Sequence, residues 1–279
     1  MDFPGFVAER CESGQVQSIR CELQAEDDVK ALAALAGRKF DLCVFLAANT
    51  SVPQSVSEPA VDLLANTLTV LNVLKAIRIE RFIFLSSGAV YDGIGGPVGP
   101  DTPLAPSLPY AISKLAAELY TRRAYADGKI GGYALIRFFG AYGMFEPSRK
   151  IYSRLVEELG VQNRTIFEIY GDGSNLVDAM YADDAVAAIL KVCGDTRPAV
   201  TVDLARGEPL AVAELVSRAA RHFLSRDVTI RKAGKAHEAI HFVPDAMPFQ
   251  ELYDFRCSIS LEEGLDRMLA QRLQGANAR

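Results

Sequence analysis

The sequence has no tryptophan, three histidines and five cysteines among its 279 residues, and no apolar run approaches the length needed to span a bilayer. The cysteines are odd in number and lack metal-ligand spacing, which favours reduced thiols in a cytoplasmic protein over a disulfide framework. His237 and His241 stand four positions apart without another ligand nearby, so a solvated face is favoured over a zinc site. The net charge of -5 gives no electrostatic reason to expect nucleic-acid binding, which leaves a small molecule as the expected partner.

Compact apolar runs alternate with amphipathic stretches, a pattern typical of a parallel sheet covered by helices. Strands are predicted at 40–48, 81–87, 133–139 and 200–204. Helices are predicted at 59–77, 107–125, 183–193 and 212–223. The run at 40–48 is so continuously apolar that it predicts a strand buried on both faces. The glycine- and proline-rich stretch 92–109 predicts a loop.

Tyr110 and Lys114 have the spacing Tyr-x-x-x-Lys within one of these helices, so their side chains share a face one turn apart. An ammonium group near a phenol favours the phenolate and lowers a pKa that is otherwise about 10. A tyrosine tuned in this way can take a proton from an alcohol, or return one to a carbonyl, near neutral pH. Alone the pair is weak evidence, because the same spacing arises by chance in many helices.

Ser86 and Ser87 end a predicted strand, which is where open α/β sheets hold their ligands. A serine hydroxyl there can donate to a substrate oxygen while the tyrosine handles its proton. The alternative is that Ser87 only caps the strand end. With Tyr110 and Lys114 the serine predicts a catalytic site.

Several segments resemble, in order and separation, the extended short-chain dehydrogenases/reductases of the NAD-dependent epimerase/dehydratase family. They lie at 46–48 (LAA), 84–91 (FLSSGAVY), 109–114 (PYAISK), 137–143 (RFFGAYG), 170–184 (YGDGSNLVDAMYADD) and 253–265. The resemblance runs from about residue 15 to the C-terminus. It implies an α/β fold: a Rossmann-like doubly wound parallel sheet, N-terminally incomplete, with a smaller C-terminal substrate lobe. The implied cofactor domain comprises 1–145 and 178–204, and the implied lobe comprises 146–177 and 205–279.

The resemblance also implies a role for each matching residue. Tyr110 would be the catalytic acid/base, Lys114 its pKa-lowering partner, and Ser87 the catalytic serine. NAD, with NADP as the alternative, would be bound by Glu22, Leu23, Leu46, Ala47, Ala48, Asn66, Ser86, Tyr110, Lys114 and Phe139. Substrate contacts would come from Ser87, Tyr110, Gly140 and Arg149. The helices at 59–77 and 107–125 match the pair that forms homodimers in the family.

The family's opening strand, glycine-rich turn and helix have no match here, because 16–23 already looks like the third strand of the sheet. Gly93, Gly96 and Gly99 have the spacing Gly-x-x-Gly-x-x-Gly, which could be mistaken for the missing glycine-rich turn. The prolines among them forbid a helix, so they predict a loop. Three explanations are open: a start codon assigned too far downstream, a natural relic, or strands supplied by another chain. The first is favoured, and the chain as written is expected to bind NAD weakly or not at all, which calorimetric titration would test.

Two departures bear on the substrate. Gly140 stands where many sugar-nucleotide epimerases carry an asparagine that contacts the substrate phosphates, and Val177 stands where an arginine usually precedes the aspartate matched by Asp178. Arg149 and Lys150 are candidates to supply the replacement charge. The favoured function is an NAD-dependent epimerase of a sugar or nucleotide sugar, acting through a transient ketone. The alternatives are a related ketone or alcohol reductase and a catalytically silent binding protein.

Overall fold

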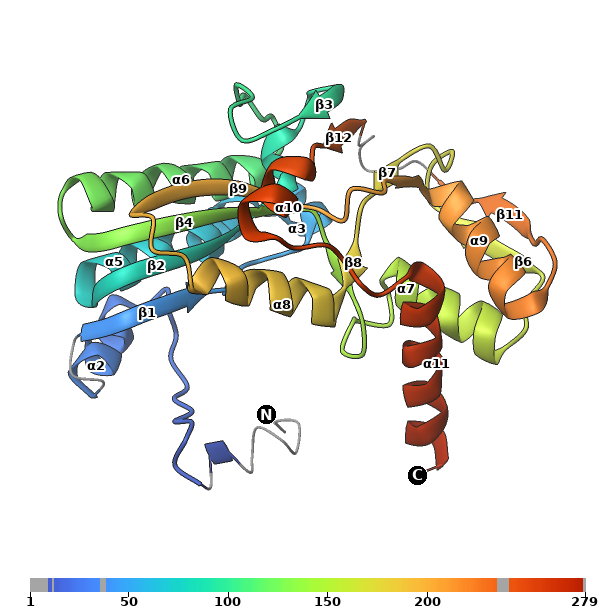
Figure 1. Ribbon diagram of the computed structural model, residues 1–279, viewed down its shortest axis with the longest axis horizontal. Coiled ribbons are helices and arrows are strands. Elements are labelled where there is room, and N and C mark those ends of the chain that lie inside the picture. The colour runs from blue at the N-terminus through green and yellow to red at the C-terminus, as the bar shows by residue number, and fades with distance from the viewer. Residues whose placement is uncertain (1–9, 12, 36–38, 235–240, 278–279) are drawn as a thin grey trace.

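A parallel sheet of four strands forms the centre of the computed structural model, which describes residues 10–11, 13–35, 39–234 and 241–277 (Figure 1). The strand order is β1-β2-β4-β9, so β1 lies at one edge and β9 at the other. Their bounds are β1 (Lys39–Phe45), β2 (Arg78–Ser87), β4 (Ile130–Phe138) and β9 (Ala199–Leu204). All three pairings are parallel, so the carboxyl ends of the strands meet along one edge of the sheet.

Helices cover both faces of this sheet (Figure 1). One face packs on α2 (Glu26–Leu35), α5 (Thr69–Ala76) and α6 (Pro109–Ala126), while α4 (Pro59–Leu63) and the π-helical turn η1 (Leu64–Leu68) pack beside α6. The other face packs on α8 (Ala182–Cys193) and α10 (Met247–Tyr253). Phe82 and Phe84 enter the first core while Ile83 enters the second, because successive side chains of a strand point to opposite faces. This arrangement confirms the predicted α/β fold with a parallel sheet.

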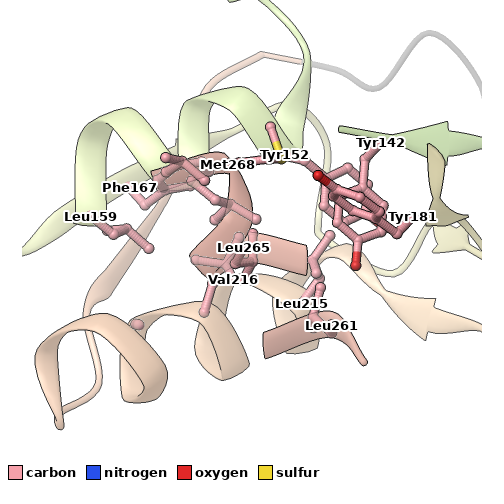
Figure 2. Close-up of a cluster of buried hydrophobic side chains, with 14 of the residues drawn as sticks. Tyr142, Tyr152, Leu159, Phe167, Tyr181, Leu215, Val216, Leu261, Leu265 and Met268 are labelled. Carbon is pink, nitrogen blue, oxygen red and sulfur yellow. The ribbon is translucent and has the colours of Figure 1, made fainter. Parts of the chain in front are cut away.

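A third hydrophobic core lies beyond the carboxyl edge of the sheet, in the C-terminal part of the chain (Figure 2). Its helices are α7 (Ile151–Leu155), the continuing π-helix η3 (Val156–Val161), α9 (Val212–Leu224) and α11 (Leu261–Asn277). Leu159, Phe167, Leu215 and Leu265 fill the centre. The parallel strands β6 (Ile166–Ile169) and β11 (Thr229–Lys232) close one side.

Short elements lie between the sheet and this C-terminal core. Parallel bridges link β3 (Gly96–Val98) with β12 (Phe242–Pro244) and β5 (Ala141–Tyr142) with β8 (Met180–Tyr181), and an antiparallel bridge links β7 (Leu176–Val177) with β10 (Leu210–Ala211). The helical turns α3 (Val52–Ser57) and η2 (Gly88–Tyr91) follow the carboxyl ends of β1 and β2. None of the helices in the described ranges is both long and apolar enough to cross a membrane.

Two predictions about the N-terminal part were wrong. Residues 16–23 form no strand: the outer edge of β1 is unpaired, but these residues do not pair with it. The strand β1 is not buried on both faces: Phe40, Leu42 and Val44, which share one face, are 37%, 39% and 38% exposed. These three side chains belong to none of the hydrophobic cores of the described residues, so this apolar face of β1 stays open.

The other predicted strands and helices were confirmed within a few residues. The loop at 92–109 was also confirmed, since it contains only the three-residue β3 and the first residue of α6. Gly93 and Gly96 adopt φ values of 80° and 81°, so they serve as turn residues in that loop.

Candidate active site

A cavity of about 490 Å³ lies between the carboxyl edge of the sheet and the C-terminal core. Ser87, Tyr110 and Phe139 line it on the side of the sheet, while Tyr152 and Val177 line it on the opposite side. Ligands of open α/β sheets bind at this edge, so the cavity is the natural place for a substrate.

Ser87 and Tyr110 reach this cavity from two different elements, β2 and α6, and Ser87 lies near enough to lower the pKa of the Tyr110 hydroxyl. Ser87 is the last residue of β2, and its Oγ accepts a hydrogen bond of 3.1 Å from the backbone N–H of Ala89, which caps η2. Burial raises the pKa of Tyr110 above 10, and the neighbouring Ser87 hydroxyl opposes that rise. The structure thus brings together two of the three residues predicted to be catalytic.

Lys114 lies one turn further along α6 and is 2% exposed. Its Nζ donates a hydrogen bond of 2.6 Å to the carbonyl oxygen of Leu85 and lies 4.3 Å from the centre of the Phe84 ring. Burial lowers the pKa of Lys114 to about 8, although Glu118 and Asp62 favour its charged form. Lys114 is not among the groups that shift the pKa of Tyr110, so the predicted lowering of that pKa is not found in this structure.

A buried polar cluster ties the segment after β1 to α6. The Asn66 side-chain amide donates to Asp62 at 2.9 Å and to Ser113 at 3.0 Å, and its Oδ1 accepts from the backbone N–H of Asn49 at 2.8 Å. Ser113 also donates to Asp62 at 2.6 Å. Asn66 is therefore held beside the residues that follow β1. Sequence reasoning missed Asp62, although its spacing of four from Asn66 within an apolar helix was the available signal.

A second buried cluster crosses the sheet beneath Ser87. Arg137 donates to both carboxylate oxygens of Glu118, at 3.1 and 3.0 Å, and to the hydroxyl of Tyr91 at 2.8 Å. The Tyr91 hydroxyl lies 2.8 Å from Asp203 on β9. Ser86 donates to Glu118 at 2.6 Å. The hydroxyl of Ser86 is thus engaged between the sheet and α6, and Ser86 does not line the cavity.

The stability of the protein should depend on the ionisation of Asp203. Burial raises the pKa of Asp203 to about 6, against an ordinary 3.8, so the unfolded chain releases this proton first as the pH rises. The contribution of Asp203 is therefore fully present below about pH 4 and is lost by about pH 6, and it amounts to about 1–3 kcal/mol. In Asp203→Asn this loss should be absent when the free energy of unfolding is measured in urea between pH 4 and 7. Asp227→Asn removes an exposed carboxylate and serves as control; an unchanged pH slope in Asp203→Asn would contradict the prediction.

The remaining predicted residues lie in several environments. Phe139 lies on the cavity wall, while Ala47 and Ala48 follow the carboxyl end of β1. Glu22 is exposed, and Leu23 packs against the core beside α2. Of the residues predicted to bind the cofactor, only Tyr110 and Phe139, at its nicotinamide end, line the cavity.

The predicted substrate residues are only partly brought together. Gly140 does not line the cavity, and its φ of 142° makes any side chain there strained. Arg149 is exposed and does not line the cavity, whereas Lys150 does. Leu46, predicted to contact the cofactor, is 58% exposed. The described residues contain no cluster of three or more potential metal ligands, and His237 lies outside them.

Comparison with known proteins gives consistent results. An uncharacterized UDP-glucose epimerase of Bacillus subtilis, YtcB, is 28% identical over 217 residues, which cover 74% of this chain and 65% of that protein. A putative UDP-glucose 4-epimerase of Methanocaldococcus jannaschii is 25% identical over 243 residues, 83% of this chain and 77% of that protein. This chain therefore spans about two thirds of the length of the first of these relatives.

Solved structures share the fold. A variant of the UDP-glucuronic acid 4-epimerase from Bacillus cereus, in complex with NAD and a fluorinated UDP-glucuronic acid, superposes with a TM-score of 0.83 at 20% identity. The match covers 97% of this chain and 85% of that one. The model of the NAD dependent epimerase/dehydratase family matches residues 7–202, well over half of the chain. The chain therefore belongs to the NAD-dependent epimerase/dehydratase family, whose members are enzymes with NAD as their cofactor.

Proposed function

We propose that this chain catalyses NAD-dependent oxidation and reduction at a substrate carbon that bears a hydroxyl or keto oxygen. The observation that carries this proposal is that Ser87 and Tyr110, two hydroxyl side chains from different elements, line the wall of one cavity. Two hydroxyl groups held together at a ligand-binding edge can share a substrate oxygen, one orienting it and the other exchanging its proton.

The residues divide this work by position. Tyr110 takes the proton from the substrate hydroxyl during oxidation and returns it during reduction. Ser87 donates to the same oxygen and keeps it beside Tyr110. Lys114, with a pKa of about 8, is mostly cationic at neutral pH. In the Michaelis complex this buried charge favours the phenolate of Tyr110, because an opposite charge nearby stabilises an ionised group.

The residues present fit the nicotinamide end of the cofactor. NAD, when bound, accepts the hydride from the substrate carbon or returns it. Tyr110 and Lys114 would hold the nicotinamide ribose, since an ammonium has three donors and the bond to Leu85 uses one. Phe139 would pack against the nicotinamide ring from the cavity wall.

Two forms of the reaction are candidates. The first is epimerisation of a sugar or nucleotide sugar through a transient ketone, which the names of the relatives support. The second is net reduction of a ketone or oxidation of an alcohol. A mostly apolar cavity wall favours the second form. The two forms differ in cofactor behaviour, because an epimerase returns its hydride in each cycle and leaves the total NADH unchanged.

Turnover is tested with the full chain, millimolar NAD or NADH, and two substrates. Epimerisation predicts conversion of UDP-glucose, detected by chromatography, without net NADH formation. Net reduction predicts NADH consumption with 2-acetylnaphthalene, an apolar ketone. Absence of any turnover with these and related alcohols and ketones would overturn the proposal.

We also propose that the chain forms a homodimer through α4, η1 and α6. Ile112 and Leu119 lie seven residues apart on one face of α6 and are 46% and 55% exposed, and Val61 on the neighbouring α4 is 45% exposed. Large apolar side chains left open on two adjacent helices are typical of a helix-bundle interface.

Leu119→Glu should convert this dimer into a monomer, because it places a carboxylate in the apolar contact. We expect the dissociation constant of the dimer to rise about 10- to 100-fold, measured by light scattering over a concentration series. Leu190→Glu, on the exposed face of α8, is the matched control and should leave the dimer intact. A parent chain that is monomeric at micromolar concentration would contradict the proposal.

A further inference from the structure

The chemistry of the cavity wall limits what the active site can hold. The wall is built mainly from aliphatic and aromatic side chains, among them Ile94, Leu108, Val177 and Phe242. A volume of about 490 Å³ is within the usual range for small-molecule sites. We propose that this cavity takes a substrate with an apolar body and a single anionic group, and not one that carries a diphosphate. This inference rests on the proposed function and names its substrate class.

The two carboxylates on the wall are already occupied by the protein. Asp92 accepts hydrogen bonds from the backbone N–H groups of Ser107 and Leu108 at 2.8 and 3.0 Å. Asp178 accepts from the backbone N–H of Gly207 at 3.0 Å. Both side chains therefore hold loops in place and are poorly available to bind the hydroxyl groups of a sugar.

Positive charge on the wall is scarce. Among the residues that the structure describes, Lys150 is the only lysine or arginine that lines the cavity. Arg149 precedes it but does not line the cavity, and Gly140 and Val177 have no side chain able to donate to a phosphate oxygen. Lys150 lies on the wall opposite the sheet, at the start of α7. One ammonium group can pair with one anionic group.

A diphosphate in this cavity would be poorly compensated. It carries at least two negative charges, and burying an ionised group without a partner is costly. An apolar wall instead favours a ligand with an apolar body, because binding then removes apolar surface from water. An apolar body along Leu108 and Phe242, with its reacting oxygen at Tyr110 and its anion at Lys150, satisfies the groups that the wall offers.

Calorimetric titration of the full chain with three probes tests this inference without requiring turnover. The probes are 2-naphthoate, which has an apolar body and one carboxylate; 2-naphthol, which lacks the charge; and UDP-glucose. The dissociation constant of 2-naphthoate should be at least about tenfold lower than that of UDP-glucose. Lys150→Gln should weaken 2-naphthoate about two- to fivefold and leave 2-naphthol unchanged. Arg149→Gln removes a charge one residue away that does not line the cavity, so it should alter the affinity for neither probe.

The outcomes separate this inference from the proposed function. Tighter binding of UDP-glucose than of 2-naphthoate, an unchanged affinity for 2-naphthoate in Lys150→Gln, or no detectable binding of 2-naphthoate would overturn the inference and leave the Ser87–Tyr110 chemistry standing. Tyr110→Phe should still bind 2-naphthoate. If the binding pattern holds but the parent chain turns over no alcohol or ketone, the substrate class of the cavity stands and the redox reaction is overturned.

Discussion

Replacing Tyr110 with phenylalanine is expected to lower kcat by about two to four orders of magnitude, the usual contribution of a positioned general acid or base. The substitution removes only the hydroxyl beside Ser87 and leaves the ring, which lines the cavity, in place. Substrate binding should therefore change little, so the loss should appear in kcat and not in KM. Steady-state rates with whichever substrate the parent chain turns over give this measurement.

Tyr120→Phe provides the matched control for this variant. Tyr120 lies on the same helix, α6, but is 47% exposed on its outer surface. Losing its hydroxyl should leave kcat within about twofold of the parent, as expected for a surface change of a few tenths of a kcal/mol. A kcat for Tyr110→Phe close to that of Tyr120→Phe would remove Tyr110 from the chemistry.

How well each strand could be predicted from the sequence depends on whether it has neighbouring strands and helices packed on its faces. The runs that became β2 and β4 were predicted within a few residues, because both strands have neighbours on each side and helices on each face. The segment 16–23 alternates apolar and polar residues, as a strand can, yet it forms no strand. A strand is stable only when it pairs with another strand, and the local pattern of 16–23 does not record that it leaves the outer edge of β1 unpaired.

For the adjacent residues Ser86 and Ser87, the sequence predicts the direction of each side chain but not its partner. Ser86 and Ser87 both end β2, and the period of two in a strand already implies that only one can face the cavity. Ser87 is that residue, while Ser86 faces α6 and donates to Glu118. Glu118 lies 32 residues away on α6, so only the tertiary packing of helix on sheet brings these two side chains together.

The pair formed by Arg137 and Glu118 is expected to be a major determinant of stability. Both side chains are almost completely buried, at 2% and 0% exposure, and two parallel hydrogen bonds join them. Arg137→Met keeps most of the side-chain volume but leaves the Glu118 carboxylate without its cation. Breaking one partner of a buried ion pair typically costs about 3–5 kcal/mol, so the free energy of unfolding should fall by that amount. Denaturation in urea measures it.

The double variant Glu118→Leu/Arg137→Met distinguishes the origin of this cost. If the penalty comes from the stranded carboxylate, removing both charges should recover at least half of the stability lost in Arg137→Met, because apolar replacements of buried ion pairs are often close to neutral. Arg122→Met is the single-site control, since Arg122 lies 3.7 Å from the same carboxylate but is 39% exposed, and it should cost less than about 1 kcal/mol. A double variant no more stable than Arg137→Met would instead locate the cost in Tyr91 and Ser86, which lose Arg137 and Glu118 as hydrogen-bond partners.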